Sequence, residues 1–299
     1  MRNLFSTRTV RLSLAFLGLL GLLLTISCGS GKPQLSKNSP EYLYSQAKEA
    51  MADVKYEKAI SLTNDLQQKF PDSEHATKAR ILRVVLLAGL SSAYRDMAEA
   101  YLAGFEKPGG NSGKLRSTAF DYLRKQKNAA LGLSEAADYF LKDTSAAKTY
   151  VLECDFPSRE VSHNKRLDDV KEGNVLDGDQ RRAAEEHEVW DGMISTVSFF
   201  VGAAGDRPKA RKLLETGTKT MDRPEFIVRL GRTMLDNQKV FGRPLLNDVQ
   251  LFRQFYDKAV ACSDLSQKLL KESPSAEVQT MADNLKGELE TMEKKGGKS

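Results

Sequence analysis

The hydrophobic positions of this chain recur mostly at three- and four-residue steps, which is the spacing of one face of an α-helix. From residue 41 onward the sequence is rich in Ala, Leu, Lys, Glu and Gln. The valine-rich alternation that marks sheet strands is nearly absent. We therefore expect an all-α fold, built of helical hairpins in a short solenoid or in a two-part helical array.

The helices that follow residue 39 are indicated most clearly. Ser39 and Pro40 suit a helix start, because Ser can cap free N–H groups and Pro is tolerated in the first turn. Residues 56–70 then carry apolar side chains at helical spacing, and Pro71 predicts a break before the next helix.

Changes of composition divide the rest of the chain. The stretch at 155–182 is the most polar and indicates a long loop or linker, whereas the residues around Trp190 indicate a buried core helix. The expected parts are a leader at 1–27, a flexible tether at 28–39, an N-terminal helical region at 40–154, the polar loop or linker at 155–182, a C-terminal helical region at 183–292 and a disordered tail at 293–299.

The leader has three zones. It begins with Arg2, Arg8 and Arg11 and no acid, continues through 15 uncharged residues at 12–26, and ends in a small residue before Cys28. An apolar run of this length suits a secretory signal and falls short of the roughly 20 residues that a membrane-spanning helix needs.

The end of the leader resembles the signal of a bacterial lipoprotein (a lipobox), and the matching residues are Leu24, Ile26, Ser27 and Cys28. Thr25, where Leu is usual, departs from that motif. The resemblance implies that residues 1–27 are removed and that Cys28 is acylated, with palmitate among its chains. Two or three acyl chains hold a protein stably on a bilayer.

The residue after the cysteine indicates which membrane carries the anchor. Gly29 is not the Asp that usually retains such lipoproteins at the inner membrane, so the resemblance implies the outer membrane, with the chain facing the periplasm. An ordinary secretory signal with a chance cysteine and an uncleaved anchor are the alternatives.

The leader also changes how charge and cysteines are interpreted. The formal net charge of +5 comes from 45 basic and 40 acidic residues, and removal of residues 1–27 leaves 42 basic ones. Such a nearly neutral chain lacks the basic footprint of a nucleic-acid-binding protein.

In an oxidising compartment, Cys154 and Cys262 fit either a disulfide or two separate buried thiols.

The segment that begins at residue 56 matches the second helix of a tetratricopeptide repeat, and the signature positions are Tyr56, Ala59, Ile60, Leu66, Phe70 and Pro71. Residues 41–83 thus resemble repeats of the lipoprotein subunit of the outer-membrane β-barrel assembly machine and of periplasmic cell-division coordinators. Thr63, in place of an aromatic residue, departs from the pattern. A similar stretch from Tyr256 suggests a degenerate repeat near the C-terminus.

Catalytic and metal-binding patterns are missing from the sequence. His75, His163 and His187 have no metal-ligand spacing among themselves. The acids that flank His187 within 185–188 diverge around a helix, so we expect a solvated charged face there rather than a site. We therefore expect a protein that is not an enzyme and that uses no metal or cofactor.

These features favour a lipid-anchored periplasmic scaffold or adaptor. Stacked helix pairs form a concave groove for extended peptides or helices, and the resemblance implies envelope proteins or peptides as partners. Candidate groove aromatics are Tyr42, Tyr56, Tyr94 and Tyr101, although such positions more often belong to a core. The alternatives are a small-molecule-binding accessory lipoprotein of an envelope transporter and a self-associating structural protein.

Overall fold

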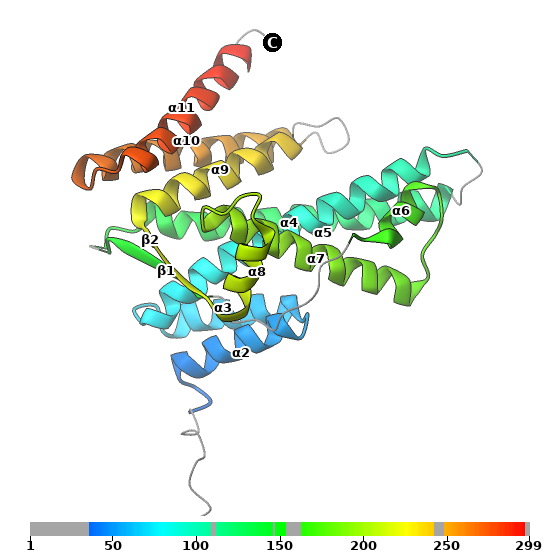
Figure 1. Ribbon diagram of the computed structural model, residues 1–299, viewed down its shortest axis with the longest axis horizontal. Coiled ribbons are helices and arrows are strands. Elements are labelled where there is room, and N and C mark those ends of the chain that lie inside the picture. The colour runs from blue at the N-terminus through cyan, green and yellow to red at the C-terminus, as the bar shows by residue number, and fades with distance from the viewer. Residues whose placement is uncertain (1–35, 109–111, 146, 154–162, 242–247, 297–299) are drawn as a thin grey trace, which may run out of the picture.

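The computed structural model describes residues 36–299 except 109–111, 146, 154–162, 242–247 and 297–299. Within these residues the chain forms ten α-helices and two short β-strands (Figure 1), which confirms the all-α fold class. The elements are α2 (Pro40–Ala52), α3 (Tyr56–Lys69), α4 (Glu74–Phe105), α5 (Ser112–Lys142), β1 (Thr149–Glu153), α6 (Lys165–Lys171), α7 (Gly178–Phe200), α8 (Arg207–Thr216), β2 (Thr218–Asp222), α9 (Arg223–Phe241), α10 (Val249–Glu272) and α11 (Ala276–Gly296).

Side-chain caps set several helix starts. The Ser39 hydroxyl accepts a hydrogen bond from a backbone N–H three residues on, at 3.2 Å, and Ser73 caps α4 in the same way at 3.1 Å. Asp206 and Asp248 do the same for α8 and α10. Each cap stabilises its helix by about 1 kcal/mol, so these polar residues fix where the helices begin.

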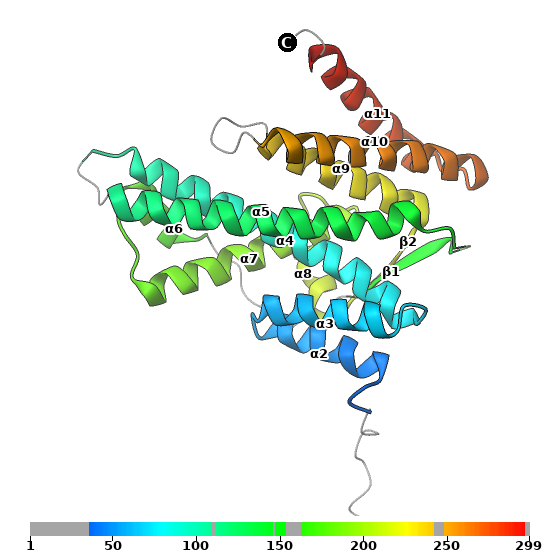
Figure 2. The same ribbon diagram turned by 180° about the vertical axis from the view of Figure 1, so that it is seen from behind.

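Helix α4 is the centre of the fold. It has 32 residues and is therefore about 48 Å long. Nineteen of them are buried on all sides of the helix, because α3, α5, α6, α7 and β1 all contact it. Figures 1 and 2 show α2 and α3 at one end of the molecule, α9, α10 and α11 at the other end, and α4 and α5 between them.

The segment 41–83 begins with a helical hairpin, α2 and α3, which packs against α4. Since α4 is nearly as long as a whole 34-residue repeat, it does not have the helix–turn–helix form of a second unit. The similar stretch at Tyr256 lies inside α10, which begins at Val249, whereas α3 begins at Tyr56. The C-terminal stretch therefore does not reproduce the boundaries of the first hairpin.

A two-stranded antiparallel sheet joins the two expected helical regions. β1 pairs with β2 from Thr149 opposite Asp222 to Glu153 opposite Thr218. The main hydrophobic core also draws on both regions, with buried side chains from Leu43 in α2 to Leu289 in α11. Trp190 is buried, as we expected.

The described part of the expected loop or linker at 155–182 is only partly a loop, since residues 172–177 are not helical but the residues on either side of them are. Residues 165–171 form α6, whose buried face contacts α4, and α7 already begins at Gly178. A capping box formed by Asp177 and Gln180 fixes that start. The stretch is polar because these helices expose most of their surface.

The C-terminal helix extends further than expected. The expected disordered tail at 293–299 is wrong for residues 293–296, because α11 continues to Gly296. The leader, Cys28 and the tether as far as Leu35 lie outside the described residues, and so does Cys154, whose pairing with Cys262 therefore stays a prediction. In the part that the structure describes, no helix combines the length and the apolar character needed to cross a membrane.

Candidate binding groove

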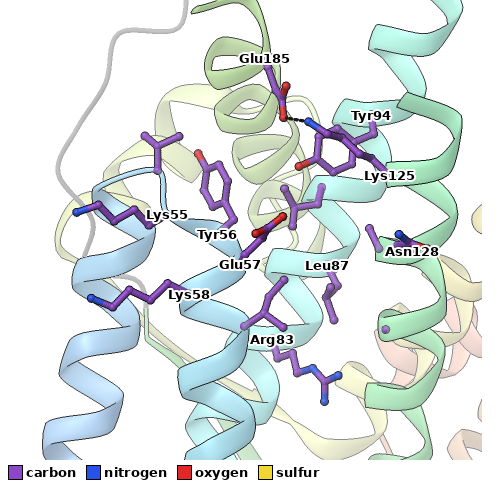
Figure 3. Close-up of a pocket in the computed structure, with 15 residues that line it drawn as sticks. Lys55, Tyr56, Glu57, Lys58, Arg83, Leu87, Tyr94, Lys125, Asn128 and Glu185 are labelled. Carbon is purple, nitrogen blue, oxygen red and sulfur yellow. Dashed lines mark hydrogen bonds and ion pairs between the residues drawn. The ribbon is translucent and has the colours of Figure 1, made fainter. Parts of the chain in front are cut away.

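A groove of about 590 Å³ lies between the start of α3 and the helices α4, α5 and α7 (Figure 3). We call it the α3 groove. Its volume falls within the range of about 300–1,000 Å³ that is usual for ligand sites. It is lined by Val54, Lys55, Tyr56, Glu57, Lys58, Ile60, Arg83, Leu87, Leu90, Tyr94, Lys125, Asn128, Ala129, Gly132 and Glu185.

One lip of the groove is the tight turn from α2 to α3. The N–H of Val54 donates to the carbonyl of Met51 at 3.0 Å, and the N–H of Lys55 donates to that of Ala50 at 2.8 Å. This Schellman pattern requires a left-handed residue, and the φ of Val54 is 64°. Glycine is usual at this position, so a β-branched side chain stores roughly 1–2 kcal/mol of strain there.

The far wall is a charged and aromatic cluster. The Lys125 ammonium donates to a Glu185 carboxylate oxygen at 2.6 Å, and the Tyr122 hydroxyl donates to the other oxygen at 3.2 Å. Lys125 also lies 5.2 Å from the ring centroids of both Tyr94 and Tyr122, so it makes cation–π contacts with both. Figure 3 shows Lys125 passing over Tyr94 toward Glu185. The cluster ties α4, α5 and α7 together beside the groove.

The tyrosines of this cluster stay protonated. Burial, and then the negative charge of Glu185, raise the pKa of Tyr94 and of Tyr122 well above the usual value. Their hydroxyl groups therefore act as hydrogen-bond donors at neutral pH. The arrangement suits binding and positioning rather than proton transfer.

Arg83 is the most buried of the charged groups that line the groove. Only 14 % of its side chain is exposed, and its guanidinium lies 3.6 Å from Glu135. The Nε–H finds no hydrogen-bonding partner among the described residues. Burial lowers the pKa of Arg83, which Glu135 partly opposes, but a guanidinium remains charged at neutral pH. A buried cation with a free donor is costly unless an acceptor reaches it.

The rim adds further positive charge. Lys55 and Lys58 are exposed at the start of α3, and Lys55 forms an ion pair with Asp53 at 2.9 Å. With Arg83 and Lys125 the lining holds four basic side chains, against two acidic ones. The lining side chains thus carry a formal excess of two positive charges around an apolar floor, which Asp53 and Glu135 outside the lining partly offset.

The structure separates the four candidate tyrosines. Tyr56 and Tyr94 line the groove from opposite sides. Tyr42 lies on α2 and packs, half-buried, against the main core. Tyr101 follows the core alternative, because it is 1 % exposed and packs 5.6 Å from the ring of Tyr122 in a second hydrophobic cluster.

The repeat-signature residues all lie on or directly after α3. Ala59 and Leu66 are fully buried, which agrees with close packing of α3 on its neighbours. The half-buried members are Tyr56, Ile60 and Phe70, and Pro71 is exposed beyond the helix end. Of these six, Tyr56 and Ile60 also line the groove.

Sequence patterns do not predict the far wall of the groove. The solvated face expected at 185–188 is wrong, because the side chains of Glu185, His187 and Glu188 are only 25 %, 19 % and 13 % exposed. Helix α7 packs along α4 and so covers them. Tyr122 and Lys125, three residues apart on one helix face, are the only local signal for the cluster in the sequence.

The described residues contain no group of three or more His, Cys, Asp or Glu side chains arranged to hold a metal ion. No known protein family, curated protein or solved structure matches this chain.

Proposed function

We propose that this chain is a lipid-anchored adaptor of the bacterial cell envelope. Acylated Cys28 would hold it in the outer membrane, facing the periplasm, and the α3 groove would bind a segment of an envelope protein. The lipobox-like leader supports the anchor, and the groove supports the binding. The protein acts by binding rather than by catalysis.

Arg83 indicates which chemical group the partner segment carries. Its buried guanidinium leaves the Nε–H without an acceptor among the described residues, and the groove lining holds four basic side chains against two acidic ones. A carboxylate satisfies both, because charge-assisted hydrogen bonds to a guanidinium are among the strongest in proteins. The apolar floor, with Ile60, Leu87 and Leu90, accepts an aliphatic or aromatic side chain. The partner segment is therefore acidic and carries an apolar anchor.

Photo-crosslinking in intact cells tests the groove. A photoreactive residue in place of Asn128, which lines the groove, should capture a defined set of envelope proteins. Lys58→Glu should strongly reduce that capture, because it reverses a rim charge. Lys268→Glu makes the same charge change on an exposed position of α10 outside the groove, and should leave capture unchanged.

Two results would contradict binding of an acidic segment in the α3 groove. If a photoreactive residue at position 268 captures the same proteins as one at position 128, the groove is not the binding site. Capture that persists in Lys58→Glu at wild-type strength would also exclude an acidic partner segment.

The anchor has its own test. A Cys28→Ser form should leave the membrane fraction during detergent-free washing, while the unaltered protein should stay there. A Cys28→Ser form that remains fully membrane-bound would contradict lipid attachment at this residue. This test does not depend on the groove, so the two parts of the proposal can fail separately.

A further inference from the structure

A second, smaller cavity of about 290 Å³ lies among α4, α5, α7 and α9. It is separate from the α3 groove, because α4 and α5 contribute different residues to each. Hydroxyl and carboxamide groups dominate its lining, which includes Ser91, Ser92, Gln126, Thr196 and Asn237, and Phe199 adds an aromatic ring.

Gln126 lines this cavity, and its buried carboxamide is not satisfied by hydrogen bonds within the described part of the chain. It is 1 % exposed, and neither its Oε1 nor its Nε2 has a hydrogen-bonding partner among the described residues. Buried carboxamides are normally satisfied, and each exception calls for an explanation, such as a bound molecule. Because both atoms lack partners, Gln126 can donate to and accept from the same ligand.

The charged groups of the cavity are already paired. Arg95 interacts with Asp96 at 3.0 Å and donates to the Ser92 hydroxyl at 3.1 Å. Asp236 lies 3.4 Å from Arg232 and 3.5 Å from Lys239. A ligand therefore meets no uncompensated charge here, which favours a neutral molecule over an ion.

The remaining polar groups form a fixed network. The buried Ser91 hydroxyl donates to Asn237 Oδ1 at 2.8 Å, and Asn237 Nδ2 donates to the carbonyl of Thr233 at 2.9 Å. The network holds α4 against α9 and leaves the Ser91 oxygen able to accept a further hydrogen bond. Donors and acceptors thus line a rigid wall.

We propose that this cavity binds a neutral polyhydroxylated molecule of the size of one monosaccharide. Hydroxyl groups can both donate and accept, which matches Gln126 and the Ser91–Asn237 network. Phe199 offers an apolar ring for the carbon face of such a ligand. The volume is at the small end of the range for ligand sites, so it fits one sugar ring rather than a chain. This site goes beyond the proposed adaptor function.

Titration calorimetry on the full-length lipoprotein, in a detergent without a sugar head group, tests the proposal. The probes are glucose, glucuronate and glucosamine, the last at a pH at which its amine is protonated. We expect glucose to bind at millimolar concentration or below, and the two charged sugars to bind at least about tenfold more weakly.

Two matched variants show whether Gln126 is responsible. Gln238 is equally buried, and its carboxamide also lacks partners among the described residues, but it does not line the cavity. Gln126→Leu should weaken glucose binding at least about tenfold, and Gln238→Leu should leave it unchanged. Both should raise the denaturation midpoint of the free protein, because each removes buried polar atoms without partners. Gln126→Met replaces Gln126→Leu if the latter does not fold.

The proposal is overturned by any of three results. Absence of glucose binding at millimolar concentration would mean that the cavity holds water only. Equal binding of glucose by Gln126→Leu and the unaltered protein would place the sugar elsewhere. Equal binding of the charged sugars would contradict the preference for a neutral ligand.

Discussion

Gly89 of α4 and Gly192 of α7 meet where the two helices cross, and a Cβ atom on Gly192 would lie 2.4 Å from the carbonyl oxygen of Gly89. Because that neighbour is backbone, a side chain at Gly192 would force the helices apart. We expect Gly192→Ala to lower the free energy of unfolding by about 1–3 kcal/mol, as overpacked cores do. Urea denaturation followed by circular dichroism measures this.

Gly287 provides the matched control. It lies on the exposed side of α11, and a Cβ atom there would meet nothing within 4 Å. Gly287→Ala should therefore raise the free energy of unfolding by about 0.5–1 kcal/mol, because Ala favours the helix over Gly. Equal effects of the two substitutions would mean that α4 and α7 do not approach closely at Gly192.

Substitution of Val54 should stabilise the protein. Val54→Gly removes the left-handed strain of the α2–α3 turn, and the half-exposed valine side chain gives up little packing. We expect the free energy of unfolding to rise by about 1 kcal/mol. Val54→Ala keeps the positive φ without Gly, so it should gain clearly less. A loss of stability in Val54→Gly would show that the valine side chain contributes more than its conformation costs.

Local signals explain which parts of the fold can be predicted from the sequence. Ser39 and Ser73 act through hydrogen bonds to residues three positions away, so the α2–α3 hairpin and the start of α4 follow from short stretches. The stretch at 155–182 misleads for the same reason, because the exposed faces of α6 and early α7 have the composition of a loop.

The site depends on contacts that no short stretch contains. Lys125 and Glu185 are 60 residues apart and meet only because α5 and α7 both pack on α4. The same holds for the β1–β2 pairing of residues 149–153 with 218–222. The sequence places Tyr56, Tyr94 and Tyr101 on helices but does not say which of them lie together. The way the helices cross determines that Tyr56 and Tyr94 share the groove, while Tyr101 packs in the core.

The Cys262 thiol should be unreactive in the folded protein. It is free and fully buried, and burial raises its pKa to about 12, although Lys258 opposes this. At pH 8 a far smaller fraction of Cys262 than of ordinary cysteines is therefore ionised. In a Cys28→Ser, Cys154→Ser background, iodoacetamide should label Cys262 only after unfolding in guanidinium chloride.

An exposed cysteine serves as the control for that measurement. Ser117→Cys on α5, in a chain without the native cysteines, should react quickly in the folded state. Labelling of native Cys262 at a comparable rate would contradict its burial beneath α9 and α11.

Asp143 should make the stability of the protein depend on pH. Its side chain is 7 % exposed, and it accepts hydrogen bonds from the Ser145 N–H at 2.8 Å and from the Tyr150 hydroxyl at 2.8 Å, beside Arg223. Burial raises the pKa of Asp143, but these partners together outweigh it, so the pKa is lowered from the usual value. The stabilisation is thus fully present above about pH 4, the unfolded-state pKa, and is lost as the pH falls through the lower folded-state value.

Asp143→Asn isolates that contribution. At pH 7 we expect it to lower the free energy of unfolding by about 2–3 kcal/mol, because the amide neither carries the charge nor accepts all of the same hydrogen bonds. The difference from the unaltered protein should shrink steadily below about pH 4, where the aspartate itself becomes protonated. Exposed Asp264→Asn should change the free energy of unfolding by less than about 0.5 kcal/mol at either pH. Urea denaturation across this pH range measures all three proteins, and a deficit of Asp143→Asn that stays constant down to low pH would mean that the carboxylate charge is not what stabilises the β1 junction.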